Sequence, residues 1–311
     1  DDSYIYGFSH THLNGTGVPD LCDILFAPTT GVTRWNNGSD GKPGYGSKFS
    51  HKNETAAPGY YKVQLDDYNI TAELTATIRA GMHSYTFPSG SEANILVDLF
   101  HRDEVLASDI RIISDTKIEG LRRSRSWAEN QYVYFVAEFS KPFLSYEIAV
   151  DNKVVTGIKS VTDSKNCKAI FHFGNTSGEP VYVKVGISAV STEGAQKNMD
   201  AEMKGLSFTE VKQKAYEAWK KELSKIEVEG GTDDQKTVFY TALYHTMVNP
   251  NVFMDVDGSY RGRDLKVHNN TSFTNYSVFS LWDTYRACHP LMTIIDQKRT
   301  LDFLKTFMVQ Y

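Results

Sequence analysis

Trp282, Asp283 and Arg286 lie close together in a stretch that mixes aromatic and charged residues. A sugar site combines an aromatic face, which covers the C–H side of the ring, with carboxylates that bind hydroxyls. If this stretch is helical, Asp283 and Arg286 stand one turn apart, which is also the spacing of an ordinary ion pair. The residues by themselves therefore leave two interpretations open, a saccharide contact and a structural ion pair.

His10 and His12 are separated by one residue, so on a strand both imidazoles would face the same side. A common ligand or metal could then contact both rings. Asp20 is the one further metal-binding residue nearby, which is too few for a zinc set, and a polar loop over residues 13–17 is favoured instead. This loop has neither of the glycine spacings that bind phosphate.

The segment that begins Asp255-Val256-Asp257-Gly258 resembles the start of a calcium loop, in which carboxylates at alternate positions converge on the cation. Lys266 stands at the twelfth position, where an EF-hand needs a bidentate glutamate. The sequence therefore predicts a turn in which Asp-Gly reverses the chain. No carboxylate pair is marked as a general acid and base by apolar surroundings, and the GxSxG nucleophile motif is absent.

The amino-acid composition is typical of a globular protein and argues against nucleic-acid binding. The chain has 311 residues, 41% hydrophobic and 23% charged, as expected for about two globular domains. Its net charge of −5 gives no basic excess for nucleic acid, and three scattered cysteines are too few for a disulfide framework. No run approaches the ~18 apolar residues of a membrane span. We expect a soluble protein that does not bind nucleic acid.

Two periodicities divide the chain. From about residue 60 to 191, apolar residues alternate with polar ones, including one run over residues 72–80, and turn residues separate the runs. This pattern predicts a β-sandwich of many short antiparallel strands. The basic cluster at residues 122–125 precedes the strand-like run 132–139, and we interpret it as a solvated strand end or turn.

After residue 191 the apolar period becomes helical, which predicts a domain boundary there. Ser207 or Thr209 can cap a helix over residues 210–226, and Thr232 can begin a second helix that stops before Pro250. The polar stretch 251–280 is long for a connection inside a domain, and such connections are more often functional than idle.

Several motifs resemble, in the same order, those of glycoside hydrolase family 92, the calcium-dependent exo-α-mannosidases. In the first half of the chain they occupy residues 7–17, 49–51, 58–61, 72–77, 85–88, 127 and 134–143. In the second half they occupy residues 242–246, 257–262 and 276–284.

The resemblance implies a β-sandwich N-terminal domain followed by a helical linker and the first helices of an (α/α)6 barrel, with the pocket at their interface. We place the sandwich at residues 1–191, the linker at 192–231 and the start of the barrel at 232–311. The chain begins in a strand-like pattern and stops inside a helical one, so we expect the sandwich to be incomplete at its N-terminus and the barrel at its C-terminus.

The resemblance also implies an activity, the inverting, Ca2+-dependent hydrolysis of terminal α-linked mannose from glycans. Inversion needs an acid and a base carboxylate roughly 6.5–9.5 Å apart. In the family these carboxylates belong to later parts of the barrel, and no counterpart lies before Tyr311. We therefore expect this chain to supply part of the substrate pocket and to be inactive alone. A secreted, periplasmic or cell-surface location is expected.

For individual residues, the resemblance implies that Trp282 and Asp283 contact mannose in the terminal subsite. His10, His12, Tyr260 and Arg286 are expected near the pocket, while the calcium ligands stay unidentified. Two other functions remain open at this stage. One is a non-catalytic carbohydrate-binding module, and the other is a glycoside phosphorylase with the same two-domain plan.

Overall fold

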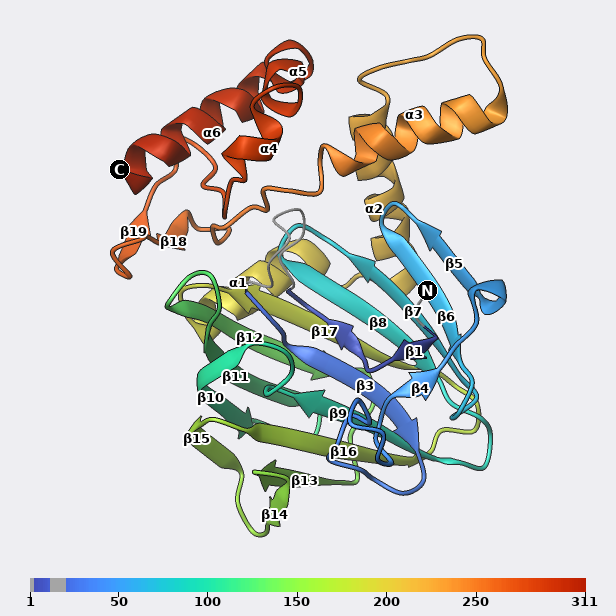
Figure 1. The fold of residues 1–311 in the computed structure, drawn as a ribbon. Coiled ribbons are helices and arrows are strands. Elements are labelled where there is room, and N and C mark those ends of the chain that lie inside the picture. Colours follow the sequence, from blue (N-terminus) through green and yellow to red (C-terminus); the bar gives the residue numbers. More distant parts are fainter. Residues whose placement is uncertain (1–2, 12–20) are drawn as a thin grey trace.

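The computed structural model describes residues 3–11 and 21–311, which form two facing β-sheets followed by helices (Figure 1). The larger sheet pairs in the order β15 (Ser160–Ser164), β10 (Glu104–Ile112), β11 (Lys117–Arg125), β12 (Gln131–Phe139), β17 (Val181–Ser188), β8 (Ala80–Thr86), β7 (Ile70–Ala76), β6 (Tyr60–Leu65) and β5 (Glu54–Ala57). The smaller sheet pairs in the order β14 (Lys153–Val155), β13 (Ser145–Val150), β16 (Cys167–Asn175), β9 (Glu92–Asp98), β3 (Leu25–Thr30) and β2 (Phe8–Ser9). The short strands β1 (Tyr4–Ile5) and β4 (Ser47–Lys48) pair separately, and residues His51–Asn53 form a 3-10 turn.

Alternating side chains of the two sheets form the main core. On β12 the inward residues include Phe135 and Ala137, and on β17 they include Val183 and Val185. They meet Phe171 and its neighbours from the smaller sheet. The predicted sandwich is confirmed, because a strand that is buried on one face shows its apolar residues at every second position.

The run over residues 72–80 is not one strand, although its alternation is continuous. Strand β7 ends at Ala76 and β8 begins at Ala80, and the backbone N–H and hydroxyl of Thr77 both bond to the carbonyl of Ala80, at 2.8 and 3.1 Å. Ile78 lies at the tip of this hairpin and is 67% exposed. Its apolar side chain continues the pattern through a turn, so periodicity alone could not reveal the reversal.

The interpretation of residues 122–125 as a solvated strand end is wrong. These residues belong to β11, and the Arg122 side chain is fully buried. Its guanidinium donates to the carbonyls of Leu99 at 2.9 Å and His101 at 2.8 Å, and also contacts the carboxylate of Asp103. A buried charge is tolerated when it is paired and hydrogen-bonded in this way.

We predict that Arg122→Ala lowers the free energy of unfolding by about 3–5 kcal/mol, because the buried Asp103 carboxylate loses its charge partner. Urea denaturation of the 311-residue chain measures this. Arg125→Ala is the matched control on the same strand, where the Glu104 ion pair is about half exposed and is worth less than about 1 kcal/mol. Equal losses in the two variants would contradict a special role for the buried pair.

Helices α1 (Thr192–Met203) and α2 (Phe208–Leu223) lie on the outer face of the larger sheet (Figure 1). Met199 and Met203 of α1 pack on Met82 and Val136 of the sheet. Gly186 allows this close approach, because a Cβ atom there would lie 2.3 Å from a carbonyl of α1. Ser207 and Glu210 form a capping box at the start of α2, so the predicted helix begins within two residues of its expected position.

The remaining helices are α3 (Asp233–His245), α4 (Leu281–Thr284), α5 (Cys288–Ile295) and α6 (Gln297–Gln310). Thr232 caps α3, as predicted. Glu222 of α2 pairs with Arg299 of α6 at 2.8 Å, and Lys225, which follows α2, pairs with Asp296, the N-cap of α6, at 2.6 Å. This arrangement matches the expected start of a helical domain. In the described part of the chain, no helix has the length and apolar character needed to cross a membrane.

Candidate functional site

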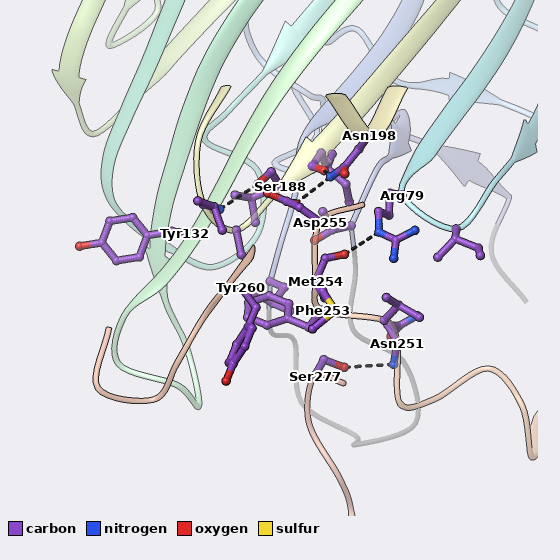
Figure 2. A pocket seen from close by; sticks show the side chains of 18 of the residues that line it. Arg79, Tyr132, Ser188, Asn198, Asn251, Phe253, Met254, Asp255, Tyr260 and Ser277 are labelled. Atoms are coloured by element: carbon purple, nitrogen blue, oxygen red, sulfur yellow. Dashed lines mark hydrogen bonds between the residues drawn. The ribbon is translucent and has the colours of Figure 1, made fainter. Parts of the chain in front are cut away.

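A cavity of about 330 Å³ lies where the larger sheet meets the polar segment 251–260 (Figure 2). The sheet and α1 contribute Arg79, Ser188 and Asn198, which come from the β7–β8 hairpin, the end of β17 and α1. The segment contributes Asp255 and Tyr260. Other lining residues are Ser9, His10, Thr11, Tyr132, Asn251, Phe253, Met254 and Ser277. The polar connection therefore borders a cleft against the sandwich.

Asp255 holds this segment against the sheet. One carboxylate oxygen accepts a hydrogen bond from Asn198 and the other from Ser188, both at 2.7 Å. Asn198 also donates to the carbonyl of Ile187 and accepts from the backbone N–H of Val256, both at 2.8 Å. One amide thus joins β17, α1 and the segment. We call Ser188, Asn198 and Asp255 the Asp255 network.

Asp255 is only 4% exposed, and its carboxylate lies against the first turn of α1. A Cβ atom at Gly194 would be 2.3 Å from this carboxylate, so glycine is required there. Burial raises the pKa of Asp255, while the hydrogen bonds from Ser188 and Asn198 lower it. The N-terminal end of a helix also favours an anion.

Arg79 holds Met254, the residue that precedes Asp255 in the segment. Its Nη1 donates to Glu202 of α1 at 2.8 Å, and its backbone N–H donates to the same carboxylate at 2.8 Å. Its Nε donates to the carbonyl of Met254 (Figure 2). Glu202 therefore orients the guanidinium, and the guanidinium orients the segment. Nothing in the order of the sequence indicated this contact, because Arg79 and Met254 are 175 residues apart.

The hairpin of β18 (Ser259–Arg261) and β19 (Val267–Asn269) is attached nearby. Arg261 donates to the carbonyl of Ala189 at 2.8 Å, and its guanidinium carbon lies 4.3 Å from the ring centroid of Tyr132. The turn predicted at residues 255–258 precedes this hairpin, with the N–H of Gly258 bonded to the carbonyl of Asp255 at 3.0 Å. Tyr260 is buried beside the cavity and stacks on His268.

His10 lines the cavity, but its ring already contacts a neighbouring side chain. Its Nε2 contacts Nε2 of His83, whose Nδ1 contacts the hydroxyl of Tyr85. Gly81 leaves room for the His10 ring, because a Cβ atom there would be 2.4 Å from it. Burial lowers the pKa of His10 to about 3 and that of His83 well below its usual value, so both imidazoles are neutral. His12 and the loop predicted at residues 13–17 lie outside the described residues.

Trp282, Asp283 and Arg286 lie outside the cavity wall. Trp282 is 83% exposed, and Ser280 holds it by accepting from its indole N–H at 3.0 Å while donating to Asp283. Arg286 donates to the Tyr285 hydroxyl at 2.7 Å and makes no ion pair with Asp283. The structural ion pair is therefore not formed. The structure brings His10 and Tyr260 to one cavity, whereas Trp282 and Asp283 lie on the exposed helix α4 and Arg286 follows it.

Comparisons with known proteins agree with this two-part architecture. The Glycosyl hydrolase family 92 N-terminal domain matches residues 1–188, and the family 92 catalytic domain matches residues 194–311. This chain belongs to glycosyl hydrolase family 92. No curated protein matches the chain.

Solved family 92 structures share the fold closely. The α-mannosidase BT3965 from Bacteroides thetaiotaomicron is 39% identical with a TM-score of 0.94, and a second structure of it holds mannoimidazole. The inverting mannosidase BT2199 from the same organism is 26% identical with a TM-score of 0.85. Each match covers 99% of this chain, but only 43% of the uncomplexed BT3965 chain and 42% of the BT2199 chain. The chain thus spans less than half the length of these relatives.

We predict that Asn198→Ala loosens the segment, because the buried Asp255 carboxylate and the N–H of Val256 each lose a partner. The free energy of unfolding should fall by about 2–3 kcal/mol, and amide hydrogen exchange should quicken at residues 254–260. Lys197→Ala is the matched control, since the Lys197–Asp257 ion pair joins the same two elements at the surface. Unchanged exchange in Asn198→Ala would contradict the role of the network.

The neutral histidine pair predicts a pH dependence. Since the folded-state pKa of His10 and His83 is lowered, the unfolded state binds more protons below pH 6.5, and stability falls as pH decreases. The loss is up to about 1.4 kcal/mol per pH unit for each imidazole. Urea denaturation between pH 7 and 5.5 measures this slope, and a double His10→Gln, His83→Gln variant should flatten it. An unchanged slope in the double variant would show that other groups cause it.

Proposed function

We propose that this chain forms part of an α-mannosidase that hydrolyses terminal α-linked mannose from glycans. Membership of family 92 and 39% identity to a solved α-mannosidase support the reaction class. The observation that carries the proposal is the meeting of the sandwich and the catalytic-domain segment over one cavity. An exposed tryptophan and carboxylate, Trp282 and Asp283, follow in the same catalytic-domain part of the sequence. Because the chain spans less than half of its solved relatives, the activity is proposed for the complete enzyme.

Trp282 and Asp283 are the proposed contacts of the terminal mannose. An exposed indole ring can cover the C–H face of a sugar, and a carboxylate can accept hydrogen bonds from its hydroxyls. Ser280 fixes both side chains before substrate arrives, which reduces the entropy lost on binding. Tyr260, His10, His12 and Arg286 are proposed to lie around the same pocket in the complete enzyme.

Inversion is the proposed stereochemical course, supported by the family resemblance and by the inverting relative BT2199. An inverting enzyme places one carboxylic acid on the leaving oxygen and one carboxylate on a water at the opposite face of the sugar. We propose that both groups come from later parts of the barrel. The role of this chain is then to bind and orient the sugar.

Calcium dependence is proposed from the family resemblance alone. Among residues 3–11 and 21–311, no group of three or more His, Cys, Asp or Glu side chains could hold a metal ion. No step is therefore assigned to the cation. A secreted, periplasmic or cell-surface enzyme that acts on mannose-containing glycans completes the proposal.

We predict that the 311-residue chain does not hydrolyse an aryl α-mannoside in calcium, whereas the complete enzyme does. In the complete enzyme, Trp282→Ala should lower kcat/KM roughly 10- to 100-fold, because the sugar loses its aromatic contact. Tyr216→Ala is the control, since Tyr216 is an exposed aromatic residue of α2, a helix that does not line the cavity. Hydrolysis by the isolated chain, or equal effects of the two variants, would contradict these assignments.

A further inference from the structure

A second cavity, of about 830 Å³, lies on the sandwich beside the short strand pair β1–β4. It is bordered by the start of the described chain, by the segment of residues 30–46 and by the β6–β7 turn. We call it the tyrosine cavity, after the rings among its main lining residues, which are Tyr4, Tyr6, Tyr68, Arg34, Lys42 and Asp67. Its volume falls within the range of about 300–1,000 Å³ that is typical of small-ligand sites.

The tyrosine cavity is separate from the cavity described above. Asp67 and Tyr68 precede β7, whereas Arg79, which lines the first cavity, follows the same strand. Strand β7 has seven residues, and at ~3.4 Å per residue its two ends are roughly 20 Å apart. In Figure 1, β1 and β4 lie below the helices α3 to α6. The Asp67 side of the tyrosine cavity is therefore well removed from the candidate active site.

The walls of the tyrosine cavity are held in place by contacts within the protein. The ring centroids of Tyr4 and Tyr6 are 5.4 Å apart. A Cβ atom at Gly46 would lie 2.6 Å from the Tyr4 ring and 2.8 Å from the Tyr6 ring, so glycine lets the chain pass beside them. The Tyr68 hydroxyl donates to the carbonyl of Tyr45 at 3.1 Å. Because these side chains are already ordered, a ligand would lose little entropy in binding them.

Several polar groups of the tyrosine cavity have unused hydrogen-bonding capacity. Among the described residues, the hydroxyls of Tyr4 and Tyr6 and the guanidinium of Arg34 have no hydrogen-bond partner. One carboxylate oxygen of Asp67 accepts from the N–H of Lys48 at 2.9 Å, and the other has no partner there. Burial raises the pKa of the Tyr4 hydroxyl, the Asp67 charge raises it further and the Arg34 charge lowers it. Both charged groups therefore act on the same ring.

The charges around the tyrosine cavity balance. Lys42 pairs with Asp40 at 3.4 Å, which leaves one cation, Arg34, and one carboxylate, Asp67. An anionic ligand would meet this carboxylate, and a cationic ligand would meet the guanidinium. Hydroxyl groups both donate and accept, so they can use the guanidinium, the carboxylate and the phenols together. Since tyrosine rings can also cover a C–H face, the lining fits a neutral saccharide.

We propose that the tyrosine cavity is a non-catalytic saccharide-binding site of the sandwich domain. Tyr4 and Tyr6 supply flat apolar faces, and Arg34 and Asp67 bind hydroxyls. The site holds one unit of a large glycan and thereby raises the effective concentration of the other chain ends at the catalytic pocket. The proposal goes beyond the mannosidase reaction. The choice of a mannan as its ligand rests on the proposed function, whereas the saccharide class follows from the cavity itself.

The competing interpretation is a gap that another part of the complete protein fills. The two interpretations differ for Arg34→Ala. A saccharide site predicts weaker glycan binding with an unchanged Tm, because the guanidinium has no partner to lose. A filled gap predicts a lower Tm with unchanged glycan binding, because protein contacts are lost instead.

The experiment measures the binding of a soluble α-linked mannan by the complete enzyme, from its retardation in a native gel that contains the polymer. All variants are made on Trp282→Ala, which weakens the proposed terminal-mannose contact. Arg34→Ala and Tyr4→Leu should each weaken the remaining binding about fivefold to tenfold. Thermal unfolding of each variant is measured in parallel.

Arg111→Ala and Tyr216→Leu are the matched controls, because both side chains are more than half exposed and line neither cavity. They should leave mannan binding unchanged. Unchanged binding in both Arg34→Ala and Tyr4→Leu would overturn the proposal, and an equal loss of kcat/KM for an aryl α-mannoside would place these residues at the catalytic pocket instead. Failure of the unmodified enzyme to cleave any α-mannoside would refute the proposed function and not this site, which the gel measurement tests separately.

Discussion

The arrangement of this chain depends on one buried carboxylate. Asp255 belongs to the catalytic-domain part of the sequence, yet both of its hydrogen-bond donors belong to β17 and α1. Removing it from water has a large desolvation cost, which is offset only when Ser188 and Asn198 are both in place. The segment can therefore occupy one position on the sheet at low energy, and the walls of the cavity follow from that position.

Polar docking of this kind gives specificity of position more than net stability. An apolar patch would attach the segment at least as strongly, but it would tolerate sliding along the sheet. Hydrogen bonds lose most of their value when the donor and acceptor are displaced or misaligned. The contact of Arg79 with the carbonyl of Met254 and the contacts of Arg261 with the carbonyls of Ala189 and Val190 add the same directional constraint on either side of Asp255.

The local elements could be predicted from the sequence, because their signals are local. Alternating apolar residues indicated the strands, and Ser207 and Thr232 indicated the helix starts, since an N-cap acts on groups within three residues. Errors arose where burial depends on distant partners. Arg122 looked like a surface residue because the carbonyls that bind its guanidinium come from loops far away in the sequence.

In the candidate site, too, residues with a local sequence signal could be predicted, and contacts between distant residues could not. Family motifs pointed to Trp282 and Asp283, and the structure leaves both side chains exposed on α4. Arg79 and Asn198 were missed, because no spacing in the sequence relates them to residues 254–256. His10 was expected near the pocket, but its close contact with His83 could not be foreseen from the chain.

The two walls of the cavity are held in place in different ways. A sheet of nine strands offers a rigid surface, because each strand is held by its neighbours on both sides except at the edges. Polar groups at the end of such a sheet keep their positions without a ligand, and binding then loses little conformational entropy. Arg79 is placed in this way at the tip of the β7–β8 hairpin, whereas Phe253 lines the same cavity from the segment that Asp255 fixes. The cavity therefore has one wall from the sandwich and one from the catalytic-domain segment.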